Sequence, residues 1–159
     1  MPRRGPARKR EAEIDPVYGD FLVAKLVNRS MKEGKKSVAR KQVYGAFELI
    51  RKETKKDPVE VFHKAIDNIK PTMEVRPRRV GGAAYQVPMS VRGPRRESLA
   101  IRWLIFAARA RSNSDYHTFA EKLSAEILDA VKEEGGAMKK KQEMERVAEA
   151  NRAFAHFRW

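Results

Sequence analysis

Three arginines beside a pair of glycines are the residues of this sequence with the clearest chemistry. Arg76, Arg78 and Arg79 come just before Gly81-Gly82, and only Glu74 stands nearby to offset their charge. A guanidinium group stays protonated and presents its N–H donors in a planar fork that matches a phosphate. We therefore expect this segment to bind a large polyanion, and specifically nucleic acid.

Cations also occupy the expected first turns of three helices, where the helix dipole favours anions. Each such arrangement costs about 0.3–1 kcal/mol in the free protein. It becomes favourable when a phosphate docks against the unpaired N–H groups of the helix. Chance runs in a lysine-rich chain are the alternative explanation. The three segments are Gly34-Lys35-Lys36-Ser37, Gly93-Pro94-Arg95-Arg96 and Met138-Lys139-Lys140-Lys141.

A third basic feature runs along the helix that is expected to start at Pro94. Arg95, Arg102 and Arg109 are seven residues apart, so they share one helical face with little drift. A basic strip of this kind suits a nucleic-acid backbone better than a small ligand. Pairing of Arg102 and Arg109 with glutamates of neighbouring helices is the alternative.

The arginines near the glycine pair must be positioned by a two-stranded β-ribbon, which we place at about residues 73–91. Pro77 and Pro88 lack a backbone N–H, so neither strand can lie inside a larger sheet. A ribbon of two strands is marginal in water unless something packs against it. Strand-forming residues on both sides of the glycine turn support this prediction: Met73, Val75, Val80, Tyr85, Val87, Met89 and Val91.

The rest of the chain predicts helices. Residues 1–14 are rich in arginine, lysine and proline, and we expect a basic disordered arm there. Residues 15–159 are expected to form one helical domain that carries the ribbon. Six helices are predicted. The first two span residues 20–32 and 37–54, and the third and fourth begin at residues 57 and 94. The fifth begins at a cap at 113–115 and is ended by the glycines at 135–136, and the sixth runs from 139 to the end. The fold class is therefore mainly α, an irregular bundle of about six helices with one protruding two-stranded β-ribbon.

Composition excludes several classes of protein. The 159 residues include 35 Lys and Arg against 21 Asp and Glu, a formal charge of +14 that favours nucleic acid as a partner. The longest apolar stretch, residues 99–110, contains Arg102 and Arg109 and is too short to span a membrane. No cysteine is present, so disulfide and thiolate chemistry are excluded.

No residue pattern indicates catalysis. His63, His117 and His156 are isolated from one another and from carboxylates at ligand spacing, so no metal site is predicted. The glycines form neither a P-loop nor a dinucleotide-binding fingerprint. We expect a protein that is not an enzyme and has no cofactor and no small-molecule substrate.

Longer motifs connect these features to a known family. They are GKK at 34–36, KPTMEVRPRRVGGAAYQVP at 70–88, RRESLAIRWL at 95–104 and GAMKKKQEMERVAEANRAFAHFRW at 136–159. Together they closely resemble bacterial small-subunit ribosomal protein seven, the uS7 family, from about residue 15 to residue 159. Pro77 departs from that pattern, because familiar bacterial members have a small polar residue there.

The resemblance implies a primary 16S rRNA-binding protein of the 30S subunit, located in the cytoplasm or in an organelle. Such a protein binds the 3′ major domain, nucleates assembly of the subunit head and lies near exit-site tRNA and mRNA. It also contacts small-subunit ribosomal proteins nine and eleven, and it requires no membrane. The implied rRNA-binding residues are Arg3, Arg4, Arg8, Lys9, Arg10, Lys35, Lys36, Arg76, Arg78, Arg79, Arg92, Arg95, Arg96, Arg102, Arg109, Lys139, Lys140 and Lys141. Those expected near tRNA and mRNA are Val80, Gly81, Gly82, Ala83, Tyr85, Arg152 and Arg158.

Two alternatives come from other classes of protein. A DNA-binding regulator of helix-turn-helix type would need a polar recognition helix, and the helix from 94 is too apolar for that role. A basic enzyme acting on RNA would need a catalytic constellation. The role of Tyr85 also stays open between stacking on an unpaired base and packing under the ribbon.

Overall fold

The computed structural model describes Gly5 and residues 13–157. Arg3, Arg4, Arg8, Lys9, Arg10 and Arg158, which we singled out above, therefore lie outside the described residues. Along the chain the elements are α1 (Phe21–Ser30), α2 (Lys36–Thr54), α3 (Pro58–Ile69), β1 (Met73–Val80), β2 (Ala83–Ser90), α4 (Gly93–Ala110), α5 (Phe119–Val131), α6 (Gly135–Ala150) and a 3₁₀ helix η1 (Arg152–Phe157).

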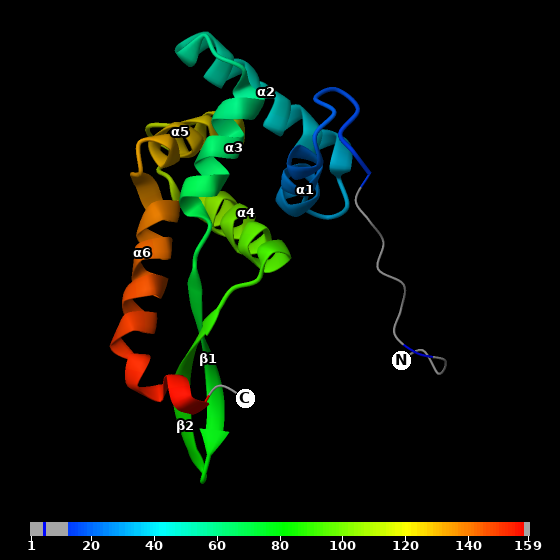
Figure 1. Cartoon of the computed structure of the whole chain (residues 1–159). Coiled ribbons are helices and arrows are strands. Elements are labelled where there is room, and N and C mark those ends of the chain that lie inside the picture. The colour runs from blue at the N-terminus through cyan, green and yellow to red at the C-terminus, as the bar shows by residue number, and fades with distance from the viewer. Residues whose placement is uncertain (1–4, 6–12, 158–159) are drawn as a thin grey trace.

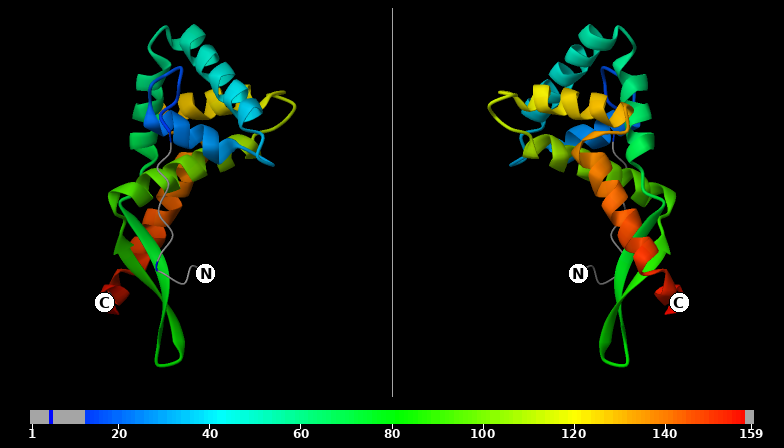
Figure 2. Two further views of the ribbon diagram at one scale, coloured as in Figure 1. Left: turned by 90° about the vertical axis from the view of Figure 1, so that its right-hand side faces the viewer. Right: turned by 90° about the vertical axis from the view of Figure 1, so that its left-hand side faces the viewer.

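The helices gather at one end of the molecule, and the β-ribbon projects from them (Figure 1). Helix α6 runs alongside the ribbon, and η1 packs against β2. The two side views in Figure 2 show the same elongated limb below the helical body. The predicted class, a mainly α bundle with one protruding two-stranded ribbon, is confirmed.

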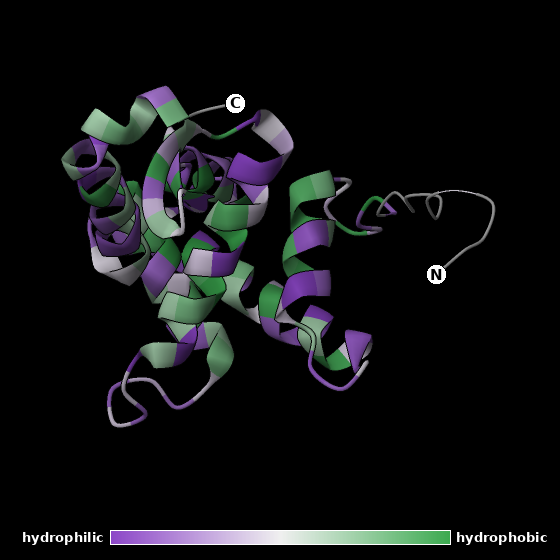
Figure 3. Ribbon diagram, turned by 90° about the horizontal axis from the view of Figure 1, so that it is seen from below, coloured by the Kyte–Doolittle hydropathy of each residue, from purple (hydrophilic) through white to green (hydrophobic). Residues whose placement is uncertain are grey.

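Helix α4 lies at the centre of the bundle, as its apolar sequence predicts. It packs against α1, α3, α5 and α6, and Leu104 in its middle is fully buried with Phe47, Phe62 and Ile127. Hydrophobic and hydrophilic residues alternate along the helices when the molecule is viewed from below (Figure 3). Phe106 of α4 is nevertheless 68% exposed.

Side-chain caps set several helix starts. Asp20 and Asp57 cap α1 and α3, accepting hydrogen bonds from the N–H groups of Val23 and Val59 at 2.8 and 3.1 Å. The predicted cap of the fifth helix at 113–115 is wrong. Thr118 caps α5 instead, in a reciprocal capping box with Glu121. The first helix also ends earlier than predicted, at Ser30.

The start of α6 overturns the prediction that the glycines at 135–136 end the preceding helix. Helix α6 begins at Gly135, whose φ of 92° is in the left-handed region that favours glycine. A Cβ on Gly135 would lie 2.9 Å from the Glu126 carboxylate, so glycine is also needed for space. Glu126 Oε1 accepts a hydrogen bond from Ala137 N at 2.8 Å and so satisfies the helix terminus.

The ribbon matches its prediction closely. Gly81 and Gly82 have φ values of 58° and 88°, as a type I′ turn requires at both of its central positions. The strands pair antiparallel from Met73↔Ser90 at the base to Val80↔Ala83 beside the turn. Arg76 and Arg78 therefore lie on one face of the ribbon, and Arg79 lies on the other.

A half-buried tyrosine on α2 gives a prediction about pH. Tyr44 donates its hydroxyl hydrogen to the carboxylate of Asp15, with oxygen separations of 2.8 and 2.9 Å. Burial, with the hydrogen bond and negative charge of Asp15, raises the pKa of Tyr44 from 10.0 to about 12. Because the folded-state pKa is the higher one, the stabilisation is complete below pH 10 and is lost as the pH rises through about 12.

We expect an ultraviolet titration to show one of the four tyrosines ionising near pH 12. The variant Tyr44→Phe should lose that late step and keep the others. Ionisation of every tyrosine of the folded protein in a single step near pH 10 would contradict the assignment.

Candidate nucleic-acid interface

A buried carboxylate joins the base of the ribbon to the start of α4. Glu74 is 4% exposed, and its two oxygens accept from Arg76 and Arg95 at 2.5 and 2.6 Å. Both arginine side chains remain about half exposed, at 48%. The ion pairs therefore hold two arginines in fixed positions while leaving part of each open to a phosphate.

We expect Glu74→Gln to lower the free energy of unfolding by about 1–2 kcal/mol, because two charge-assisted hydrogen bonds lose their anion. Hydrogen exchange of the amides near the base of the ribbon should accelerate. The matched control is Glu143→Gln, because the exposed Glu143 forms its ion pair with Lys140, one turn away on the same helix. The unfolding free energy of that variant should stay within about 0.5 kcal/mol of the parent value. Equal losses of stability in the two variants would show that Glu74 does not stabilise the junction between the ribbon and α4.

The other ribbon arginines differ in their surroundings. Arg79 is exposed beside the glycine turn, whereas Arg78 stands opposite Tyr85 on the face against which η1 packs. Gly81, Gly82 and Ala83 at the tip are exposed, and Val80 is half-buried. The tip therefore presents backbone and one open arginine on the part of the molecule farthest from the helical body (Figure 1).

Tyr85 packs within the protein. Its ring centroid lies 5.2 Å from that of Phe154 and 5.3 Å from that of Phe157. Aromatic pairs at this separation gain about 0.5–1.5 kcal/mol beyond the area that they bury. Of the two interpretations open at the sequence level, packing under the ribbon is the one that the structure supports.

The arginine strip on α4 is present at the surface, but its members are held differently. Arg95 pairs with Glu74, and Arg109 donates to the backbone carbonyl of Ser30 at 2.9 Å. Arg102 is exposed and makes no hydrogen bond or ion pair within residues 13–157. Pairing with glutamate therefore occurs at Arg95, where it was not expected, and at neither Arg102 nor Arg109.

Two of the three cationic helix starts are as predicted. Lys35 and Lys36 are exposed at the start of α2, which has no side-chain cap and no acidic residue in its first turn. Arg92 occupies the equivalent position before α4, also without a side-chain cap. Arg96 donates to the carbonyl of Pro71 at 2.9 Å, next to the ribbon base. Lys35 also pairs with the exposed Glu33.

The prediction of a third cationic helix start is wrong. Since α6 begins at Gly135, the lysines predicted at its start lie beyond its first turn. Lys139 is exposed, Lys140 pairs with Glu143, and Lys141 donates to the carbonyl of Asn68 at 2.7 Å. Farther along, Arg152 pairs with Glu149. These cations are distributed along α6 and η1 instead of surrounding a helix terminus.

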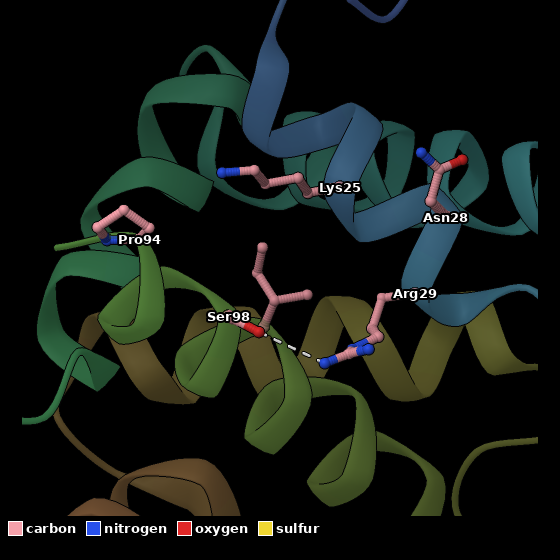
Figure 4. Close-up of a pocket in the computed structure, with 6 residues that line it drawn as sticks. Lys25, Asn28, Arg29, Pro94 and Ser98 are labelled. Atoms are coloured by element: carbon pink, nitrogen blue, oxygen red, sulfur yellow. Dashed lines mark hydrogen bonds between the residues drawn. The ribbon is translucent and has the colours of Figure 1, made fainter. Parts of the chain in front are cut away.

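Sequence reasoning missed a basic hollow between α1 and α4. Lys25 and Arg29 come from α1, and Arg29 reaches Ser98 of α4 with a nitrogen–oxygen separation of 3.4 Å (Figure 4). Lys25 pairs with Glu97 at 2.7 Å. The spacing of Lys25 and Arg29, one helical turn apart, could have indicated a shared face.

One histidine has a carboxylate partner that sequence spacing concealed. His63 Nε2 lies 2.8 Å from Asp20 Oδ2, which connects α3 to the start of α1. In the described part of the chain, no group of three His, Cys, Asp or Glu residues is placed to hold a metal ion. None of the described helices is long and apolar enough to cross a membrane.

The fold and the surface together define a class: a mainly helical, strongly basic protein that carries an arginine-bearing β-ribbon projecting from its helical body. Comparison with known proteins makes the class specific. The sequence model of the family described as "Ribosomal protein S7p/S5e" matches residues 2–152. The chain therefore belongs to this family, and it is a structural ribosomal protein rather than an enzyme.

Relatives resemble the chain over its full length. "Small ribosomal subunit protein uS7" of Caldicellulosiruptor bescii is 60% identical over 159 residues, covering 100% of both chains. The protein of the same name from Thermotoga maritima is 59% identical over 157 residues, covering 99% of both chains. That of Acetivibrio thermocellus is 55% identical over 159 residues. The resemblance inferred from the motifs is thereby confirmed.

Proposed function

We propose that this protein is a primary 16S rRNA-binding protein of the small ribosomal subunit. It binds the 3′ major domain and nucleates assembly of the subunit head in the cytoplasm. The observation that carries this proposal is the ribbon, a projecting limb with arginines on both faces that is tied to α4 through Glu74. Such a limb can reach between RNA helices while the body stays outside them.

The arrangement of cations supports a scaffold role. Exposed basic groups continue from the ribbon to the start of α4, along its outer face, and to the start of α2. RNA double helices hide their base edges in a deep groove, so shape, phosphates and 2′-hydroxyls dominate their recognition. A rigid body with separated basic surfaces can hold two RNA helices in one relative orientation.

The proposal is tested by titrating the protein against a 16S 3′ major-domain transcript and an unrelated RNA of equal length, at several salt concentrations. We expect a preference for the transcript that survives moderate salt, because shape recognition adds to the phosphate contacts. Equal affinities that fall together as salt rises would leave only a generic polycation.

We also propose that the ribbon tip and the C-terminal segment lie near exit-site tRNA and mRNA. The chain has no cysteine, so Ala83→Cys at the exposed tip can carry a single hydroxyl-radical probe. In ribosomes rebuilt with that variant, cleavage of exit-site tRNA is expected. Lys52→Cys on α2, at the opposite end of the molecule (Figure 1), is the control and should cleave none.

Small-subunit ribosomal proteins nine and eleven are the proposed protein neighbours. Cross-linking within purified 30S subunits tests this directly, because a ribosomal component should link to both proteins in the intact subunit. Subunits that yield cross-links to neither protein would remove this part of the proposal.

A further inference from the structure

One exposed aromatic residue is not explained by the fold. Phe106 is 68% exposed although it lies on α4, the most central helix. Single exposed hydrophobic residues are common on protein surfaces and require no explanation by themselves. The surroundings of this residue distinguish it.

Cations flank the ring along the helix. Arg102 precedes Phe106 by four residues and Arg109 follows by three, so all three project from the same side of α4. Arg109 is held by the carbonyl of Ser30 at 2.9 Å. Arg102 is exposed and has no partner among the described residues. An exposed aromatic ring with an arginine on either side of it along the helix combines a stacking surface with phosphate-binding charge.

A hollow of about 320 Å³ opens beside the ring, between α4 and the start of α6. Trp103, Ala107 and Ala110 form its apolar wall. The Arg111–Glu126 ion pair and Lys140, which pairs with Glu143, complete the lining. Gly136 contributes no side chain there, and a Cβ at that position would lie 3.0 Å from the Cβ of Ala107. The hollow therefore places apolar surface beside the ring of Phe106, on the side away from Arg102 and Arg109.

We propose that Phe106 receives an unpaired nucleotide of the bound RNA, with the base stacked on the ring and the adjoining phosphates at Arg102 and Arg109. An aromatic face stacks on any base, and such platforms bind single-stranded segments with little sequence preference. The basic flanks and the net charge of +14 favour RNA over an apolar protein surface as the occupant. This inference rests on the proposed rRNA-binding function and adds a site to it.

The experiment compares Phe106→Ala, Phe106→Tyr and the parent, using the 3′ major-domain transcript and a fully paired RNA duplex. Phe106→Ala should weaken binding to the transcript about 5- to 150-fold, the range for loss of one stacked base. Because no charge is removed, the slope of log affinity against log salt should not change. Binding to the duplex should stay at the parent value, and Phe106→Tyr should restore affinity for the transcript.

Phe21→Ala is the matched control, because Phe21 is also exposed, at 40%, but Lys25 Nζ covers its ring at 4.1 Å. It should leave binding to the transcript unchanged. Melting curves of all variants should coincide within a few degrees, so that loss of binding is not loss of fold.

The outcomes separate this inference from the function on which it rests. A parent protein without preference for the transcript over unrelated RNA would remove the proposed function itself. A parent with that preference whose Phe106→Ala variant binds equally well overturns the stacking site alone. The stacking site is also overturned if Phe106→Ala keeps its RNA affinity but loses a contact with another small-subunit protein.

Discussion

Replacing Arg76, Arg78 and Arg79 together by alanine is expected to weaken binding to the 3′ major-domain transcript on the order of 100-fold at moderate salt. Each phosphate contact contributes about 0.7–0.9 to the slope of log affinity against log salt, so the slope should fall by about 2. Arg76 is expected to contribute least of the three, because Glu74 already neutralises part of its charge. Filter binding over a salt series measures both quantities.

A control with the same change of charge separates position from net charge. Lys52 in the last turn of α2, and Lys55 and Lys56 in the loop before α3, are exposed at the end of the molecule opposite the ribbon (Figure 1). Their triple replacement by alanine also removes three positive charges but should change affinity and slope much less. Equal losses of RNA affinity in the two triple variants would show that binding depends on net charge and not on the position of the ribbon arginines.

Trp103→Ala should lower the free energy of unfolding by about 3–5 kcal/mol, the usual cost of removing a large aromatic side chain from a core. Trp103 is 8% exposed and is part of the hydrophobic core at the centre of the bundle. For a chain of this size the melting temperature should fall by about 6–20 °C. Differential scanning calorimetry measures the change.

Phe106→Ala on the same helix is the natural comparison. Phe106 lies three residues farther along α4 and is 68% exposed, so its truncation should change the unfolding free energy by no more than about 0.5 kcal/mol. A Trp103→Ala variant that melts with the parent would mean that the indole contributes nothing to the core.

Features that depend on neighbours in sequence could be predicted. Two glycines flanked by strand-forming residues define the ribbon turn, and its φ values match a type I′ hairpin. The caps of α1 and α3 follow from an aspartate before an apolar periodic segment. The basic character of the ribbon and of α4 was likewise visible in the spacing of arginines alone.

Features that depend on distant residues could not be predicted. The start of α6 is set by Glu126 of α5, which accepts from Ala137 N, so Gly135 opens a helix instead of ending one. The exposure of Phe106 follows from which faces of α4 its neighbours cover, and periodicity along one helix does not contain that information. The ion pair of Glu74 with Arg95 joins residues 21 positions apart, and only the fold brings them together.

The aromatic contacts between the ribbon and η1 have a consequence for the order of folding. The two strands join residues close together in the sequence, and hairpins of this kind close within microseconds. Tyr85, Phe154 and Phe157 meet only after α4, α5 and α6 have packed, because those helices lie between them along the chain. We therefore expect the two strands to pair early, and the direction of the ribbon relative to the helical body to become fixed later, when these aromatic contacts form.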